Sequence, residues 1–226
     1  MCAAGWTLRR TDDAAIARLA SVLWLLATGL AGWFAGQLAS DGFDASSRGV
    51  MLAVGIGVTV MAVPLYLVRR GTLQQLAVIA GLMILAGGAF YGSGVSVGIA
   101  FALTGVAWTW FGWEGRVEPR HASLTLGPLA GLTGAVVASI YSPNVGLWLG
   151  IVISVALLAA SVPLRHTPML GLGVAGLFVF SVWAISHYFG ETIGTPLVLL
   201  FAGVILLAVA FVAARLRGLT SERSSP

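Results

Sequence analysis

Long apolar stretches separated by short polar connections dominate this chain. Each stretch is about 20 residues long, which is the length of helix needed to cross a hydrocarbon core of about 30 Å. The pattern therefore predicts an all-α fold, a polytopic bundle of eight transmembrane helices at residues 20–39, 49–68, 72–91, 95–113, 122–140, 145–163, 168–189 and 194–214.

The connections between these stretches are rich in turn-forming residues, such as "SDGFDASSRG", "GSG" and "EGRVEPRH". None is long enough to hold a separate soluble domain. We therefore expect a short cytoplasmic leader at residues 1–19, a transmembrane domain at residues 20–214 and a cytoplasmic tail at residues 215–226. The first apolar stretch is longer than the 7–15 residues typical of a signal peptide, so it is interpreted as a retained helix.

Composition excludes a soluble globular protein, because 58% of residues are hydrophobic and 9% are charged, against about 25% charged in soluble domains. The net charge is +4. The basic residues are spread along the chain instead of clustering on one face, so no nucleic-acid partner is expected.

The arginines predict the orientation of the helices. With the N-terminus in the cytoplasm, eleven arginines fall on the cytoplasmic side and only Arg48 falls on the other. Short loops on the cytoplasmic side retain basic residues in this way. The distribution supports an even number of helices with both termini in the cytoplasm.

A spacing of eleven residues between an arginine and a glycine occurs four times. The rise of 1.5 Å per residue carries the chain about 16 Å over this interval, from the headgroup level to near the bilayer centre. A glycine at that depth permits close helix packing. We interpret the spacing as four like-oriented hairpin repeats with packing glycines, although coincidence in a glycine-rich chain is the alternative; the pairs are Arg18–Gly29, Arg70–Gly81, Arg120–Gly131 and Arg165–Gly176.

Polar residues near the predicted outer ends form the first candidate site. His187 and Glu191 are four residues apart and share a helix face, and Asp41 and Asp44 lie in the first outer loop. Histidine and carboxylates are possible metal ligands, but an interfacial ion pair is the favoured interpretation. No catalytic residue, cofactor or metal is predicted.

Polar residues near the cytoplasmic ends have similar alternatives. Gln74 and Gln75 lie one turn inside the boundary, where we expect them to extend to water instead of contacting a substrate. Two Arg–His pairs are expected to anchor the helices, with a lipid phosphate as the alternative ligand. Three tryptophans are expected to form an interfacial belt. The two Arg–His pairs are Arg120–His121 and Arg165–His166, and the tryptophans are Trp108, Trp110 and Trp113.

The segment "HYFGETIGTPLVLLFAGVILLAVAFVAARLRG", residues 187–218, resembles the last hairpin of predicted multi-spanning bacterial membrane proteins of unknown function. In these an aromatic-Phe-Gly turn precedes a leucine-rich helix that ends in arginines. The resemblance implies a bacterial inner-membrane location and assigns no catalytic residues.

Two functions are compatible with these features. Because ionisable residues are absent from the centres of the predicted spans, the first is a non-catalytic accessory or scaffold subunit that packs against a protein partner or organises membrane lipid. The second is a small permease for a neutral or hydrophobic molecule, since transporters often contain repeats. The permease predicts a central cavity lined by Thr104, Ser139, Ser154 and Ser181.

Overall fold

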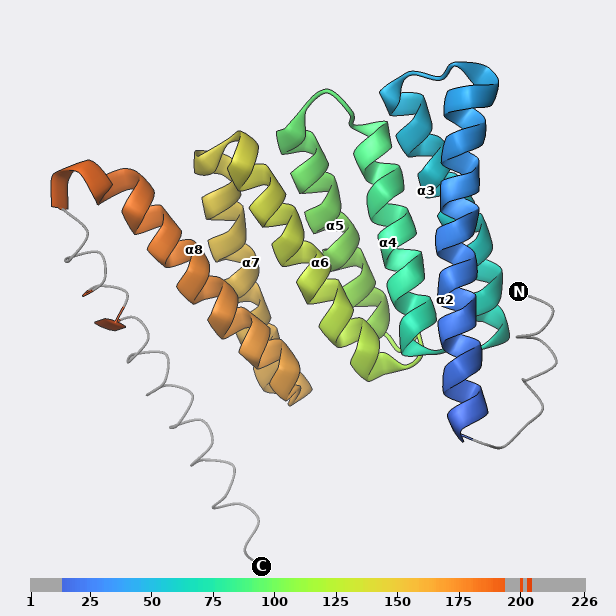
Figure 1. The fold of residues 1–226 in the computed structure, drawn as a ribbon. Helices are drawn as coiled ribbons and strands as arrows, with labels where there is room; N and C mark the ends of the chain where they lie inside the picture. The colour runs from blue at the N-terminus through green and yellow to red at the C-terminus, as the bar shows by residue number, and fades with distance from the viewer. Residues whose placement is uncertain (1–13, 194–199, 201–202, 205–226) are drawn as a thin grey trace, which may run out of the picture. The chain divides into compact units, whose positions relative to one another are not determined.

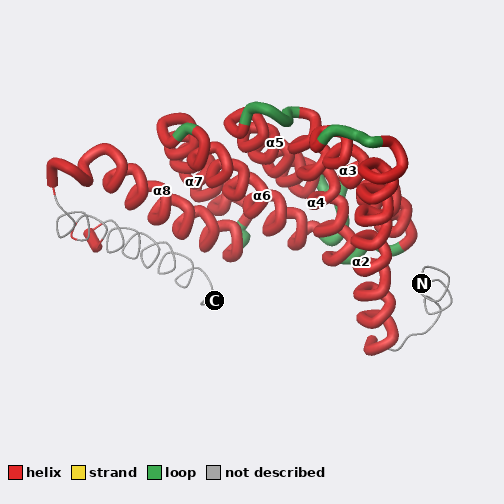
Figure 2. Tube along the Cα trace, turned by 45° about the horizontal axis from the view of Figure 1, so that its top comes forward, coloured by secondary structure: helices red, strands yellow, loops and turns green. Residues whose placement is uncertain are grey.

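The computed structural model describes residues 14–193, 200 and 203–204 of the chain. Within these residues the protein consists of helices joined by short connections, with no strand (Figures 1 and 2). The helices are α2 (Ala14–Gln37), which continues into the π-helical turn η2 (Leu38–Gly42), α3 (Ser47–Val68), α4 (Thr72–Ala89), α5 (Gly94–Trp113), α6 (Arg120–Tyr141), α7 (Pro143–Leu164) and α8 (Thr167–Ile193).

All seven α-helices in the described part are long and apolar enough to cross a membrane. The all-α prediction and seven of the predicted spans are therefore confirmed, and the chain has the character of a multi-pass membrane protein. The predicted eighth helix at residues 194–214 lies almost wholly outside the described residues, as do residues 1–13 of the predicted leader.

Two helices extend by four or more residues beyond the predicted apolar stretches. Helix α2 begins at Ala14, where the sequence predicts residue 20, and α8 reaches Ile193, where the sequence predicts residue 189. Apolarity marks the part of a helix that lies in hydrocarbon, whereas backbone hydrogen bonding continues into the polar flanks. Residues 14–19 of the predicted leader are accordingly helical.

Local chemistry explains several helix ends. The hydroxyl oxygens of Ser46 and Ser93 accept hydrogen bonds from the backbone N–H groups of Gly49 and Ser96, each at 3.4 Å, and so cap α3 and α5. Between α4 and α5 the chain turns at Gly92, whose φ of +109° favours glycine. These turns separate α4 from α5 within four residues.

The chain divides into two compact units, residues 1–142 and 143–226. In the first unit, α5 packs most extensively against α6, and α3 packs against both α4 and α2. Helix α4 makes smaller contacts with α2, α5 and α6. In the second unit, α7 packs against α8.

This packing does not confirm the predicted hairpin repeats. The prediction pairs helices across the outer loops, as in α4 with α5, whereas the most extensive contacts join α5 with α6 and α3 with α4. The physical reason is the distribution of small residues. These line the face between α5 and α6 and allow a much closer approach than α4 and α5 reach.

We call the contact of α5 with α6 the glycine seam. Gly98, Gly105 and Gly112 recur at intervals of seven residues and therefore lie on one face of α5. A Cβ atom at Gly105 would collide with the backbone nitrogen of Gly131 on α6, and one at Gly98 would collide with that of Ala138. The two backbones are thus in direct contact along the seam.

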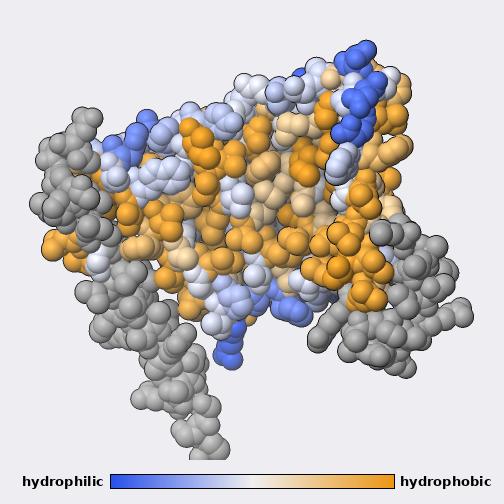
Figure 3. Space-filling view, viewed as in Figure 1, coloured by the Kyte–Doolittle hydropathy of each residue, from blue (hydrophilic) through white to orange (hydrophobic). Residues whose placement is uncertain are grey.

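Consecutive helices in the first unit alternate in direction, so its connections gather at two ends. We call the end with connections 69–71 and 114–119 the arginine end. There Arg70 pairs with Glu118 at 2.9 Å, and at the opposite end Arg48 donates to the carbonyl oxygen of Ala89 at 3.0 Å. Hydrophobic residues cover the sides of the helices and hydrophilic residues gather towards their ends (Figure 3).

Candidate functional site

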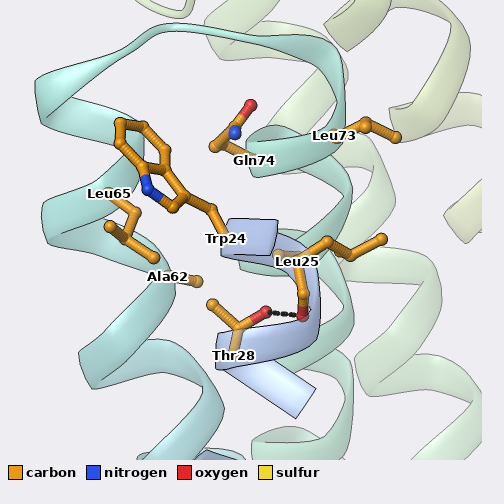
Figure 4. A pocket seen from close by; sticks show the side chains of 8 residues that line it. Trp24, Leu25, Thr28, Ala62, Leu65, Leu73 and Gln74 are labelled. Carbon is orange, nitrogen blue, oxygen red and sulfur yellow. Dashed lines mark hydrogen bonds between the residues drawn. The ribbon is translucent and has the colours of Figure 1, made fainter. Parts of the chain in front are cut away.

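A narrow recess lies between α2, α3 and α4 on the side of the arginine end, and we call it the Trp24 recess (Figure 4). Its empty volume is about 160 Å³, including the open space at its mouth, and a water molecule has no room inside it. Its lining is mostly apolar and carries no ionisable group; the residues are Trp24, Leu25, Thr28, Ala62, Leu65, Leu73, Gln74 and Ala77.

Two of the lining side chains have unpaired polar atoms. Gln74 is 4% exposed, and neither its amide nitrogen nor its amide oxygen has a hydrogen-bond partner among the described residues. The indole nitrogen of Trp24, which is 1% exposed, is likewise unpaired. Thr28 differs, because its hydroxyl donates to the carbonyl oxygen of Leu25 at 2.7 Å. A buried polar group without a partner costs about 1–3 kcal/mol, so this arrangement favours a hydrogen-bonding ligand.

The position of the Gln74 amide depends on a glycine. A Cβ atom at Gly71 would collide with the amide oxygen of Gln74, so only glycine leaves room for this side chain conformation. Gly71 belongs to the α3–α4 connection, which also carries Arg69 and Arg70. Gln74, a lining residue, therefore follows the two arginines closely in the sequence.

The neighbouring Gln75 belongs to a set of contacts that we call the Tyr66 clamp. The amide nitrogen of Gln75 donates to the carbonyl oxygen of Pro119 at 3.3 Å. The Tyr66 hydroxyl donates to the carbonyl oxygen of Glu118 at 2.7 Å and accepts from its N–H at 2.9 Å. With the Arg70–Glu118 ion pair, these bonds join the α3–α4 hairpin to the α5–α6 connection.

The expectation that Gln74 and Gln75 extend to water is wrong. Gln75 is 0% exposed, and its amide oxygen is unpaired. Trp108 is half-buried, and its indole nitrogen is also buried and unpaired. Both glutamines point among helices because α4 is surrounded by α2, α3, α5 and α6, which leaves little of its circumference open. The position of a residue along the helix predicts its depth in the membrane, whereas the neighbouring helices determine whether its side chain is buried.

The structure does not bring the candidate residues of the predicted outer ends together within the described residues. Asp41 and Asp44 belong to the first unit and His187 belongs to the second, while the side chain of Glu191 lies outside the described residues. Asp41 accepts from the hydroxyl of neighbouring Ser40 at 3.0 Å. Within the described chain, His, Cys, Asp and Glu side chains do not form a group of three that could hold a metal ion.

His187 has aromatic surroundings in the second unit. Its ring lies edge-on to that of Tyr188, with the centroids 5.1 Å apart. The Tyr188 hydroxyl donates to the side-chain oxygen of Asn144 at 2.8 Å and so ties the far end of α8 to the start of α7. These contacts have a structural role within the unit.

The four glycines predicted at packing points have different surroundings. A Cβ atom at Gly81 would lie 2.7 Å from the Thr59 hydroxyl oxygen, and Gly131 lies in the glycine seam. Gly176 is buried. Gly29 is exposed and a Cβ atom there would meet nothing within 4 Å, so it packs against no described residue.

Three of the four hydroxyls expected to line a transport cavity donate hydrogen bonds within their own helices. Thr104, Ser139 and Ser154 donate to the carbonyl oxygens of Ala100, Ala135 and Gly150 at 2.7–2.8 Å. Ser181 is partly exposed. None of the four lines the Trp24 recess.

The remaining candidates lie at connections. Trp110 is 52% exposed, packs edge-on against Trp113 and donates to Glu114 at 2.9 Å. Arg120 and His121 are exposed at the start of α6. In the second unit, Arg165 has a φ of +48°, and the ring nitrogen Nδ1 of His166 accepts from the N–H of Met169 at 3.3 Å, which caps α8.

The polar groups among the lining residues that lack partners are an amide and an indole N–H, which hydrogen-bond to neutral groups. The amino-acid sequence does not indicate this recess. A tryptophan and a glutamine at similar depth in two spans were the available signal, but residue spacing does not show which spans are neighbours. Comparison of the chain with protein-family models, curated proteins and solved structures finds no match.

Proposed function

We propose that this protein is a non-catalytic subunit of a membrane complex, an accessory or scaffold component held in a bacterial inner membrane with both termini in the cytoplasm. In the full form of this proposal, residues 194–214 form an eighth span and the chain contains four hairpin repeats. The arginine distribution supports this topology.

One observation carries the functional proposal. In the seven described helices, every Asp, Glu, Arg and His lies within the first two or the last two turns. Ion pathways and membrane-embedded catalytic sites depend on ionisable groups at depth. The central hydroxyls instead donate to their own helices, and the glycine seam fills the space between α5 and α6. These features favour a non-catalytic subunit that acts by packing against a partner protein.

A partner within the membrane would contact outward-facing side chains. Trp33 and Phe34 of α2 are 67% and 70% exposed and lie beside each other. Leu103 of α5, at 63% exposure, is an outward-facing residue on another helix. A protein partner would cover one of these two exposed positions, whereas lipid would contact both of them.

The test is photo-crosslinking in the native membrane. A photoreactive amino acid is placed at Phe34 or at Leu103 in the tagged full-length protein, followed by purification and mass spectrometry. We expect one stoichiometric protein adduct from one position and none from the other. Adducts to lipid alone from both positions, with no co-purifying protein in mild detergent, would contradict the proposal.

A permease for a neutral or hydrophobic molecule is the alternative. The Trp24 recess is the feature that favours it, since its unpaired amide and indole suit a neutral solute. The hydroxyls expected along its path have partners within their helices, so we place it second. Uptake of a neutral solute by liposomes that contain the protein alone would reverse this order.

A further inference from the structure

We propose that the Trp24 recess binds one phospholipid from the leaflet at the arginine end. The phosphate contacts Arg69, an ester carbonyl accepts a hydrogen bond from Trp24 or Gln74, and the first part of an acyl chain lies against the apolar lining. This inference goes beyond the proposed function, because a bound lipid is compatible with either a subunit or a permease.

The unpaired polar atoms are the first reason. Gln74 and Trp24 line the recess and are at least 96% buried, and the amide nitrogen and oxygen of Gln74 and the indole nitrogen of Trp24 have no hydrogen-bond partner in the described chain. Phospholipid esters supply acceptors for the two donors. A headgroup with hydroxyl or ammonium groups supplies a donor for the amide oxygen.

The second reason is an unpaired charge at the residue that follows α3, a helix that contributes to the lining. The Arg69 guanidinium has no hydrogen-bond or ion-pair partner among the described side chains, whereas that of Arg70 pairs with Glu118. The backbone N–H of Arg69 donates to the carbonyl oxygen of Leu65, a lining residue, at 3.0 Å. Basic pockets between transmembrane helices bind lipid phosphates in this manner.

Depth is the third reason. Gln74 lies two residues, or about 3 Å, inside the start of α4 at Thr72, and the non-helical connection 69–71 precedes that helix. The interfacial layer on each side of the hydrocarbon core is about 5–8 Å thick. A phosphate at the level of Arg69 therefore places the ester groups of the same lipid near Gln74 and its chains beside Leu65 and Leu73.

Entry of the lipid requires a small opening of the recess, which is too narrow for water in the form described. Helix α2 packs mainly against α3 and makes a smaller contact with α4. Separation of Trp24 on α2 from Gln74 on α4 opens the recess while leaving the α2–α3 contact in place. The occupant then supplies the partners that the closed form lacks.

The first test is a titration of the delipidated full-length protein with phosphatidylglycerol, followed by native mass spectrometry. We expect one lipid to bind more tightly than the rest. Arg69→Gln weakens this binding by about five- to tenfold, and Gln74→Leu weakens it as well. Arg120→Gln is the matched control, since it removes an exposed arginine of the same unit, and it leaves the affinity unchanged.

Three outcomes would overturn the proposal. Equal losses from Arg69→Gln and Arg120→Gln would indicate general attraction of anionic lipid to basic connections. Equal affinity for glycerol phosphate, which has no acyl chains, would indicate a simple anion site. The absence of any tightly bound lipid would indicate that the recess stays closed or is covered by a protein partner.

A second measurement tests directly whether the lipid chains lie near Trp24. Phosphatidylglycerol with brominated chains quenches nearby tryptophan fluorescence. We expect a saturable quenching component in the wild-type protein that is lost in Trp24→Phe, which keeps an aromatic ring but removes the indole. Identical quenching curves for the two proteins would place the lipid elsewhere.

Discussion

The glycine seam and the Trp24 recess represent two ways of packing helices in one unit. In the seam, small residues bring the backbones of α5 and α6 together, as Gly105 does against Gly131. In the recess, α2 meets α4 through large side chains, including Trp24 and Gln74, and leaves polar atoms unpaired. The seam is closed by backbone contact, whereas the recess is closed only by side chains.

This difference separates stability from binding. Helices in lipid associate through close packing, because the lipid tails are as apolar as the side chains. The seam meets that requirement and leaves no space for a ligand. The recess retains an energetic cost that a ligand can relieve.

The largest effect is expected at the centre of the seam. A leucine side chain at position 105 has no space because the backbone of Gly131 is in contact there. Gly105→Leu should therefore lower the free energy of unfolding by about 3 kcal/mol, in the upper range for overpacking. Equilibrium unfolding in mixed detergent micelles measures the change.

The matched control is the same substitution at Gly29, where a Cβ atom would meet nothing within 4 Å. Gly29→Leu should alter the free energy of unfolding by less than about 0.5 kcal/mol. Comparable losses from the two variants would show that the seam has no special role in stability.

The recess should respond in the opposite direction. Gln74→Leu removes two unpaired buried polar atoms, so we expect the delipidated protein to gain about 1–2 kcal/mol in free energy of unfolding. Gln75→Leu should gain less, because it also removes the hydrogen bond to Pro119. Thermal unfolding of both variants provides the comparison, and a large loss for Gln74→Leu would mean that the amide has a stabilising partner.

The Tyr66 clamp should have an intermediate effect. Tyr66→Phe removes one hydrogen bond to the carbonyl oxygen of Glu118 and one from its N–H. We expect a loss of about 1 kcal/mol and faster hydrogen exchange at the Glu118 amide. Unchanged exchange at that amide would show that water replaces the tyrosine without cost.

The smallest effect is expected for the ion pair of Arg70 with Glu118. The two side chains are 54% and 61% exposed, so solvent and salt screen their interaction. Glu118→Gln should change the free energy of unfolding by at most about 0.5 kcal/mol, and the difference should vanish in high salt. A larger, salt-insensitive effect would mean that the carboxylate has a further role.

The sequence predicts the described spans well because hydropathy over about 20 residues reports directly on membrane burial. It predicts lateral arrangement less well. Gly29 and Gly81 have the same spacing from an arginine, yet only Gly81 lies at a helix contact. The spacing from an arginine indicates how deep a residue lies along the helix, but it does not indicate which neighbouring helix the residue faces.

The candidate site illustrates the same difficulty. Gln74 is predicted at the correct level but in the wrong surroundings, because α4 is apolar on all sides and has no polar face to indicate its orientation. Trp24 is fifty positions away and reaches the same recess only through the packing of α2 on the α3–α4 hairpin. Such a juxtaposition requires the tertiary structure.

The connections of the first unit also suggest an order of assembly. Three residues join α3 to α4 and six join α5 to α6, so these hairpins close short loops at little entropic cost. Contacts between residues near in sequence form early. Four residues join η2 to α3, so α2 is brought to α3 by an equally short loop. The Trp24 recess, which α2, α3 and α4 form together, would therefore be complete before the Tyr66 clamp attaches these helices to the α5–α6 hairpin.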